Sequence, residues 1–100
     1  MTNRRRHEDW IKRAQKVQDI CADPSTALWQ KAHRVGAAYQ DVQLDGFQSK
    51  HRHKIFAALS SINEILARYP IETFDDYQLV ETKDLKAIIN TFKALGSIKI

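Results

Sequence analysis

Residues 48–69 read QSKHRHKIFAALSSINEILARY, and this stretch decides the fold class. Apolar side chains recur in it at spacings of three and four, which is the period of one face of an α-helix. The predicted apolar stripe consists of Ile55, Leu59, Ile62, Leu66 and Tyr69, with Phe56 and Ile65 widening it. Pro70 comes directly afterwards, and we expect the helix to end there because proline is not tolerated inside a helix.

Three further segments show the same period. The segment 4–22 aligns Trp10, Ala14, Val17 and Cys21. The segment 25–43, which follows Pro24, aligns Leu28, Ala32, Val35, Tyr39 and Val42. The segment 83–95, with Thr82 as its expected cap and Gly96 as its stop, aligns Leu85, Ile88, Ile89, Phe92 and Leu95. Each segment is therefore predicted to be an amphipathic helix.

These periods predict an all-α protein, a four-helix bundle in a single domain spanning residues 1–100. Short connections favour antiparallel neighbours. Between the last two long helices, Thr73 and Asp76 have the spacing of a helix cap, so a short fifth helix through Phe74, Tyr77 and Leu79 is also compatible with the sequence.

Positive charge is concentrated in the first half of the chain. Residues 1–54 contain eleven Lys/Arg and six Asp/Glu, a net charge of +5, whereas residues 55–100 contain five and six, a net charge of −1. All four histidines also lie in the basic half. Such an excess attracts polyanions, which include RNA, DNA and acidic protein surfaces.

Several classes of function find no support in the residues. The chain has one cysteine, Cys21, which excludes an internal disulfide and is typical of a reducing, cytoplasmic compartment. No run approaches the roughly 18 apolar residues of a membrane span, so no membrane partner is expected. His51 and His53 are two residues apart and diverge on a helix, which argues against a metal site. We expect no cofactor and no enzymatic activity, because no catalytic arrangement is recognisable.

Two basic clusters, Arg4–Arg6 and Lys50–Lys54, stand at the starts of predicted helices. Cations are unfavourable there because they face the positive end of the helix dipole. An anionic partner would relieve this repulsion, and free backbone amides at a helix start also favour phosphate. The candidate nucleic-acid-binding residues are Arg4, Arg5, Arg6, Lys12, Lys50, Arg52, Lys54, Lys86 and Lys93.

We therefore expect a non-catalytic nucleic-acid-binding accessory protein that contacts the phosphate backbone of RNA or DNA with little base specificity. It is of a size to serve as a small helical subunit of a larger nucleoprotein complex. The alternative is a protein-interaction module, which would be an adaptor, an inhibitor or a homo-oligomer. Its candidate partner-binding residues are Trp29, Ala57, Ser61, Ile98 and Ile100.

Overall fold

The apolar periods of the sequence appear in the structure as helices. A computed structural model describes residues 2–44 and 46–98. The elements are α1 (Thr2–Ala22), α2 (Leu28–Ala38), α3 (Ser49–Leu66), the 3-10 helix η1 (Phe74–Leu79) and α4 (Thr82–Gly96). The described residues contain no strand, which confirms the expected all-α class.

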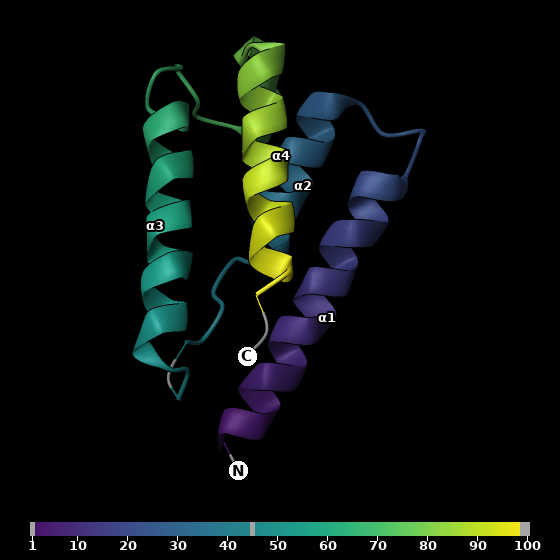
Figure 1. Ribbon diagram of the computed structural model, residues 1–100. Helices are drawn as coiled ribbons and strands as arrows, with labels where there is room; N and C mark the ends of the chain where they lie inside the picture. Colours follow the sequence, from purple (N-terminus) through teal and green to yellow (C-terminus); the bar gives the residue numbers. More distant parts are fainter. Residues whose placement is uncertain (1, 45, 99–100) are drawn as a thin grey trace.

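Helix α4 is the centre of the arrangement. It packs against α1, α2 and α3, whereas α3 packs against no described helix other than α4. The long helices alternate in direction along the chain, so α1 and α3 both begin at the end of the molecule where α4 finishes (Figure 1). The expected bundle is therefore present, but it is open between α2 and α3.

The core is built mainly from the predicted stripes. Trp10, Val17, Val35, Ile55 and Ile88 are the largest fully buried side chains. All five apolar residues assigned to the inner face of α4 are buried, which fits its position between three other helices. A helix covered on three sides needs a broad apolar face, and the sequence of α4 provides one.

An arginine joins α1 to the end of α2. The Arg13 guanidinium donates hydrogen bonds to the carbonyl oxygens of Ala38, at 3.1 Å, and Gln40, at 2.6 Å. Its Nε atom donates to the Asp9 carboxylate at 2.7 Å, which holds the guanidinium in position. Carbonyl groups at a helix C-terminus have no partner inside the helix, and a cation there complements the helix dipole.

The second helix is shorter than the predicted 25–43 at both ends. Before it, the Asp23 carboxylate accepts hydrogen bonds from the backbone and hydroxyl of Ser25 and from the hydroxyl of Thr26, which keeps this segment in a turn. These bonds lower the pKa of Asp23 to about 2. After the helix, Asp41 adopts a φ of 58°, in the left-handed region that ends helices. Apolar periodicity alone does not detect either turn.

Three smaller expectations about helix ends and burial were wrong. Thr82 is the first residue of α4, and Glu81 occupies the N-cap position without a side-chain cap bond. Phe56 does not widen the buried stripe, since 56% of it is exposed. Leu59 is only half-buried, because no helix packs on its side of α3.

The short helix after Pro70 is present as the 3-10 helix η1. The Asp76 carboxylate accepts hydrogen bonds from the backbone N–H groups of Glu72, at 2.8 Å, and Thr73, at 3.0 Å. These bonds lower the pKa of Asp76. Downstream, the Tyr69 hydroxyl donates to the buried carboxylate of Asp84 and fixes the connection to α4.

Candidate nucleic-acid interface

The solvent-facing side of α4 is basic. Because α1, α2 and α3 surround this helix, one long side of it remains exposed, and Lys83, Lys86, Asn90 and Lys93 lie there. Lys83 is 3.6 Å from the Glu81 carboxylate, but both groups are largely exposed and such a pair contributes little. Lys86 and Lys93 have no ion-pair partner within the described part of the chain.

A shallow groove separates this side of α4 from the first half of α3. Its volume is about 450 Å³, and it is lined by Lys54, Ala58, Asn90, Thr91, Ala94, Leu95 and Ile98. The Thr91 hydroxyl is used within the helix, since it donates to the Ala87 carbonyl at 2.8 Å. Lys54 and Asn90 are both exposed, and no carboxylate is among the lining residues. The groove is therefore suited to an anion or to a polar backbone.

The two basic clusters lie at the same end of the molecule, where α1 and α3 begin (Figure 1). The ring of His7, on α1, is 5.2 Å from the ring of Phe47, which precedes α3. Neither helix has an acidic residue in its first turn. Two helix starts with unneutralised cations consequently stand next to each other.

Within the α1 cluster, the members differ in what the structure describes. Arg5 is exposed and Arg6 is half-buried, while the Arg4 side chain lies outside the described residues. Lys12 is also exposed, but α1 has no packing contact with α3. The structure thus places Lys12 on α1 without bringing it to the α3–α4 groove.

The start of α3 carries the denser charge. Lys50 and Lys54 are exposed and have no ion-pair partner among the residues that the structure describes. Arg52 is half-buried and donates to the Ser49 hydroxyl at 3.2 Å. The first acidic residue of α3 is Glu64, in its last turn. Mutual repulsion at the start of α3 is therefore relieved by no carboxylate of its own helix.

The residues predicted to bind a protein partner do not share one surface. Trp29 is half-buried, and its ring stacks on that of Phe74 at 5.9 Å, so it is not a free aromatic. Ala57 and Ser61 are exposed on α3. Ile98 folds back onto the core, with its backbone N–H bonded to the Leu95 carbonyl. Ile100 lies outside the described residues.

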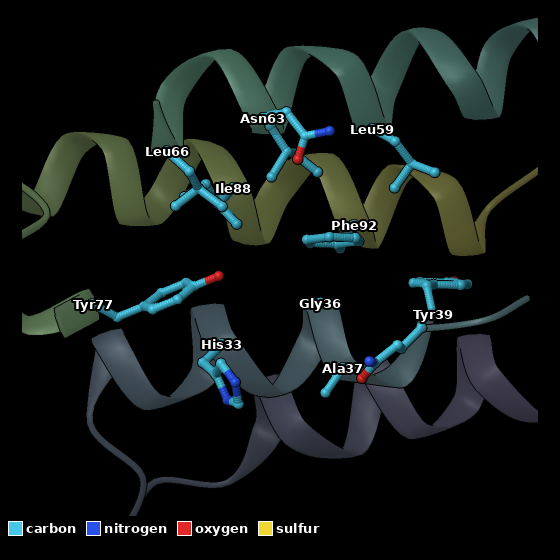
Figure 2. A pocket seen from close by; sticks show the side chains of 12 residues that line it. His33, Gly36, Ala37, Tyr39, Leu59, Asn63, Leu66, Tyr77, Ile88 and Phe92 are labelled. Atoms are coloured by element: carbon cyan, nitrogen blue, oxygen red, sulfur yellow. The ribbon is translucent and has the colours of Figure 1, made fainter. Parts of the chain in front are cut away.

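Sequence reasoning missed a cavity of about 330 Å³ between α2 and α3. Figure 2 shows Leu59, Asn63 and Leu66 of α3 on one side of it and His33 of α2 on the other, with Phe92 of α4 between them. Burial beside it raises the pKa of Tyr77. The signal was present, because 33, 36, 37 and 40 repeat the helical spacing of 59, 62, 63 and 66. These residues were not recognised as two walls facing each other.

Metal and membrane chemistry find no place in the described structure. Residues 2–44 and 46–98 contain no group of three or more His, Cys, Asp or Glu side chains arranged to hold a metal ion. No helix within the same residues is long and apolar enough to cross a membrane. In the comparisons with known proteins, no protein-family model, no curated protein and no solved structure matches the chain.

Proposed function

We propose that this protein is a non-catalytic nucleic-acid-binding accessory protein that holds the phosphate backbone with little base specificity. The observation that carries the proposal is the position of Lys54 and Asn90 on the carboxylate-free groove between α3 and α4. Lys86 and Lys93 extend this surface along α4, and Lys50 extends it along α3. Amines that have no intramolecular ion partner are available to replace the counterions of a nucleic acid.

The energetics favour a polyanion over a compact anion. Exposed amines spread over two helices release condensed counterions when a chain of phosphates binds across them, and each contact adds to the affinity. A single small anion touches only one or two of these amines and gains little. Lysine also binds phosphate as a point charge without the planar geometry that reads a base edge, which agrees with low base specificity.

The proposal includes two finer points. A reducing, cytoplasmic location is supported by the single cysteine, whose side chain is half-buried on α1. A role as a small subunit of a larger nucleoprotein complex is supported by the limited extent of the basic surface, which offers a few phosphate contacts and so would give modest affinity alone.

The test compares two triple variants with equal loss of charge. Lys50→Gln, Arg52→Gln and Lys54→Gln together remove the α3 cluster, whereas the control variant Lys16→Gln, Arg34→Gln and Arg68→Gln removes three exposed cations elsewhere. Affinity for labelled RNA and DNA oligonucleotides is measured by fluorescence anisotropy over a range of salt. We expect the first variant to lose a slope of about 0.7 to 0.9 in log K against log [salt] per contact, and the control to keep it.

Two results would refute the proposal. One is a wild-type protein without affinity for RNA or DNA at about 50 mM salt, where phosphate contacts are strong. The other is an equal loss of affinity in both triple variants, which would show that net charge acts without a defined site.

A protein-interaction module is the second candidate, and the cavity between α2 and α3 is the observation that favours it. Its two walls repeat the spacing of a helix face, and its floor is apolar at Ile88 and Phe92. A groove of this form accepts the apolar face of a partner helix. Sedimentation of the protein alone and with nucleic acid separates the candidates, because a stable oligomer that is indifferent to nucleic acid supports the interaction module.

A further inference from the structure

Phe56 is the most exposed aromatic side chain among the large apolar residues that the structure describes, with 56% of it in contact with solvent. The rings of Phe47, Phe74 and Phe92 each lie against another aromatic ring. No such contact exists for Phe56 among the described residues. One flat apolar face of α3 is therefore open to a ligand.

The surroundings of Phe56 are cationic. Arg52 and His53 precede it by four and three residues, and side chains at these spacings are neighbours on a helix surface, with Cβ atoms about 5–6 Å apart. Lys50 lies one turn before His53. The only helix that packs against α3 is α4, whose buried acidic residue, Asp84, is engaged by the Tyr69 hydroxyl near the other end of α3. The aromatic face thus stands beside positive charge without a neighbouring carboxylate.

Other exposed apolar residues lack this combination. Ile11 and Leu79 are aliphatic, although they are 62% and 55% exposed. Phe74 is 49% exposed, but its ring is already occupied by Trp29 and His33, and it is followed by two aspartates. An aromatic ring without a stacking partner and next to cations is thus specific to the first half of α3.

A nucleobase attached to a phosphate chain matches this combination of groups. Bases stack on aromatic side chains whatever their sequence, and positive side chains nearby hold the phosphates on either side. In a duplex the bases are already stacked and paired, so their faces are not available to Phe56. A ring beside a basic surface therefore favours single strands over duplexes.

We propose that Phe56 is the base-stacking residue of this surface and makes it select single-stranded nucleic acid over duplex. The proposal rests on the nucleic-acid-binding function proposed above. One unpaired base lies on the Phe56 ring, Arg52 and His53 contact the adjoining phosphates, and the strand continues across Lys50 and Lys54 towards the α3–α4 groove. Selection for single strands then comes from the ring, whereas general affinity comes from the lysines.

The experiment measures binding of one labelled oligonucleotide, alone and annealed to its complement, at about 50 mM salt. Phe56→Ala and Phe56→Leu remove the flat ring, and we expect single-strand affinity to fall roughly 5- to 150-fold, the range for one stacked base. Duplex affinity should stay within about twofold, because its phosphate contacts remain. Phe56→Trp keeps an aromatic face and should retain single-strand affinity, with its added emission quenched on binding.

Leu79→Ala is the matched control, because this residue is as exposed as Phe56 and lies away from the start of α3. Unchanged binding in this control and loss in the two Phe56 variants supports the stacking role. If all Phe56 variants bind single strands like the wild type, the stacking role is refuted and the phosphate-binding function stands. If the wild type binds neither strand nor duplex, both proposals fall together.

Discussion

Replacing Ile55 by alanine tests how α3 is held in the molecule. Ile55 is 1% exposed and faces α4, which is the sole helix that α3 contacts in the described structure. The change removes three buried carbons, which is about 2.4 kcal/mol of transfer free energy at about 0.8 kcal/mol for each. A sealed void adds to this loss, so we expect about 3 to 4 kcal/mol of destabilisation.

Leu59→Ala is the matched comparison on the same helix. Leu59 is half-buried and borders the cavity between α2 and α3, so its truncation enlarges an open space instead of creating a sealed one. About half of the same transfer term then remains, or about 1 kcal/mol. The ratio of the two losses therefore reports whether α3 is open on the side of α2, as Figure 2 shows.

Urea unfolding followed by two probes gives the measurement. Far-UV circular dichroism reports all helices, whereas the tryptophans Trp10 and Trp29 lie on α1 and α2. Because α3 depends on one interface, Ile55→Ala should lose part of its dichroism before its fluorescence changes. Coincident transitions in Ile55→Ala, or equal losses of stability in both variants, would refute the reasoning.

Three further predictions concern single side chains. Gly36→Ala should raise the unfolding free energy by about 0.5 to 1 kcal/mol, since glycine is unfavourable inside a helix and the new methyl would meet Phe92 at an ordinary 3.6 Å; Gly96→Ala should lower it, because its methyl would lie 3.2 Å from a methyl of α1 and 3.3 Å from the Tyr39 hydroxyl, and chemical denaturation of both variants checks the contrast. Burial raises the pKa of Tyr39 to about 12, so folding favours the protonated phenol and this stability, complete below pH 10, is lost as pH rises from about 10 to about 12; Tyr39→Phe should flatten that decline in a pH series of melting temperatures, and an unchanged slope would contradict it. Hydrogen bonds lower the pKa of Asp23 to about 2, so its contribution is present above pH 4 and is lost as pH falls from about 4 to about 2; Asp23→Ala should be less stable than the wild type at neutral pH, with the difference vanishing near pH 2.

Helix α4 shows what periodicity can predict. Its five apolar residues were assigned to the inner face from spacing alone, and all five are buried. The assignment succeeds because α4 is covered on three sides, so its apolar residues have a neighbour over a wide arc. The exposed lysines of α4 follow from the same pattern, since they occupy the remaining arc.

Helix α3 shows where periodicity fails. Phe56 and Leu59 belong to the same apolar face by spacing, but the side of α3 on which they lie has no helix against it. A sequence pattern states which residues prefer burial and does not state how many neighbours the helix obtains. The ends of α2 were missed for a different reason, because hydrogen bonds to Asp23 and the left-handed conformation of Asp41 override the apolar period.

The basic clusters could be identified from the sequence, but their placement could not. Charge at two helix starts is visible in the residues, whereas their position at one end depends on the alternating directions of the helices (Figure 1). The groove that includes Lys54 and Asn90 joins residues 36 positions apart in the chain, and such contacts are set by tertiary packing. Neither helix alone carries a signal for it.

The central position of α4 has a consequence for synthesis of the protein. As the chain leaves the ribosome, α1 and α2 are made first, and they can pair through their own contacts and through Arg13. Helix α3 emerges next, and no completed helix offers it a packing surface until α4 has followed. The apolar face of α3 is then exposed during translation, which is when unfinished chains aggregate or meet chaperones. A ribosome that stalls before residue 82 would therefore hold a paired hairpin and an unprotected helix.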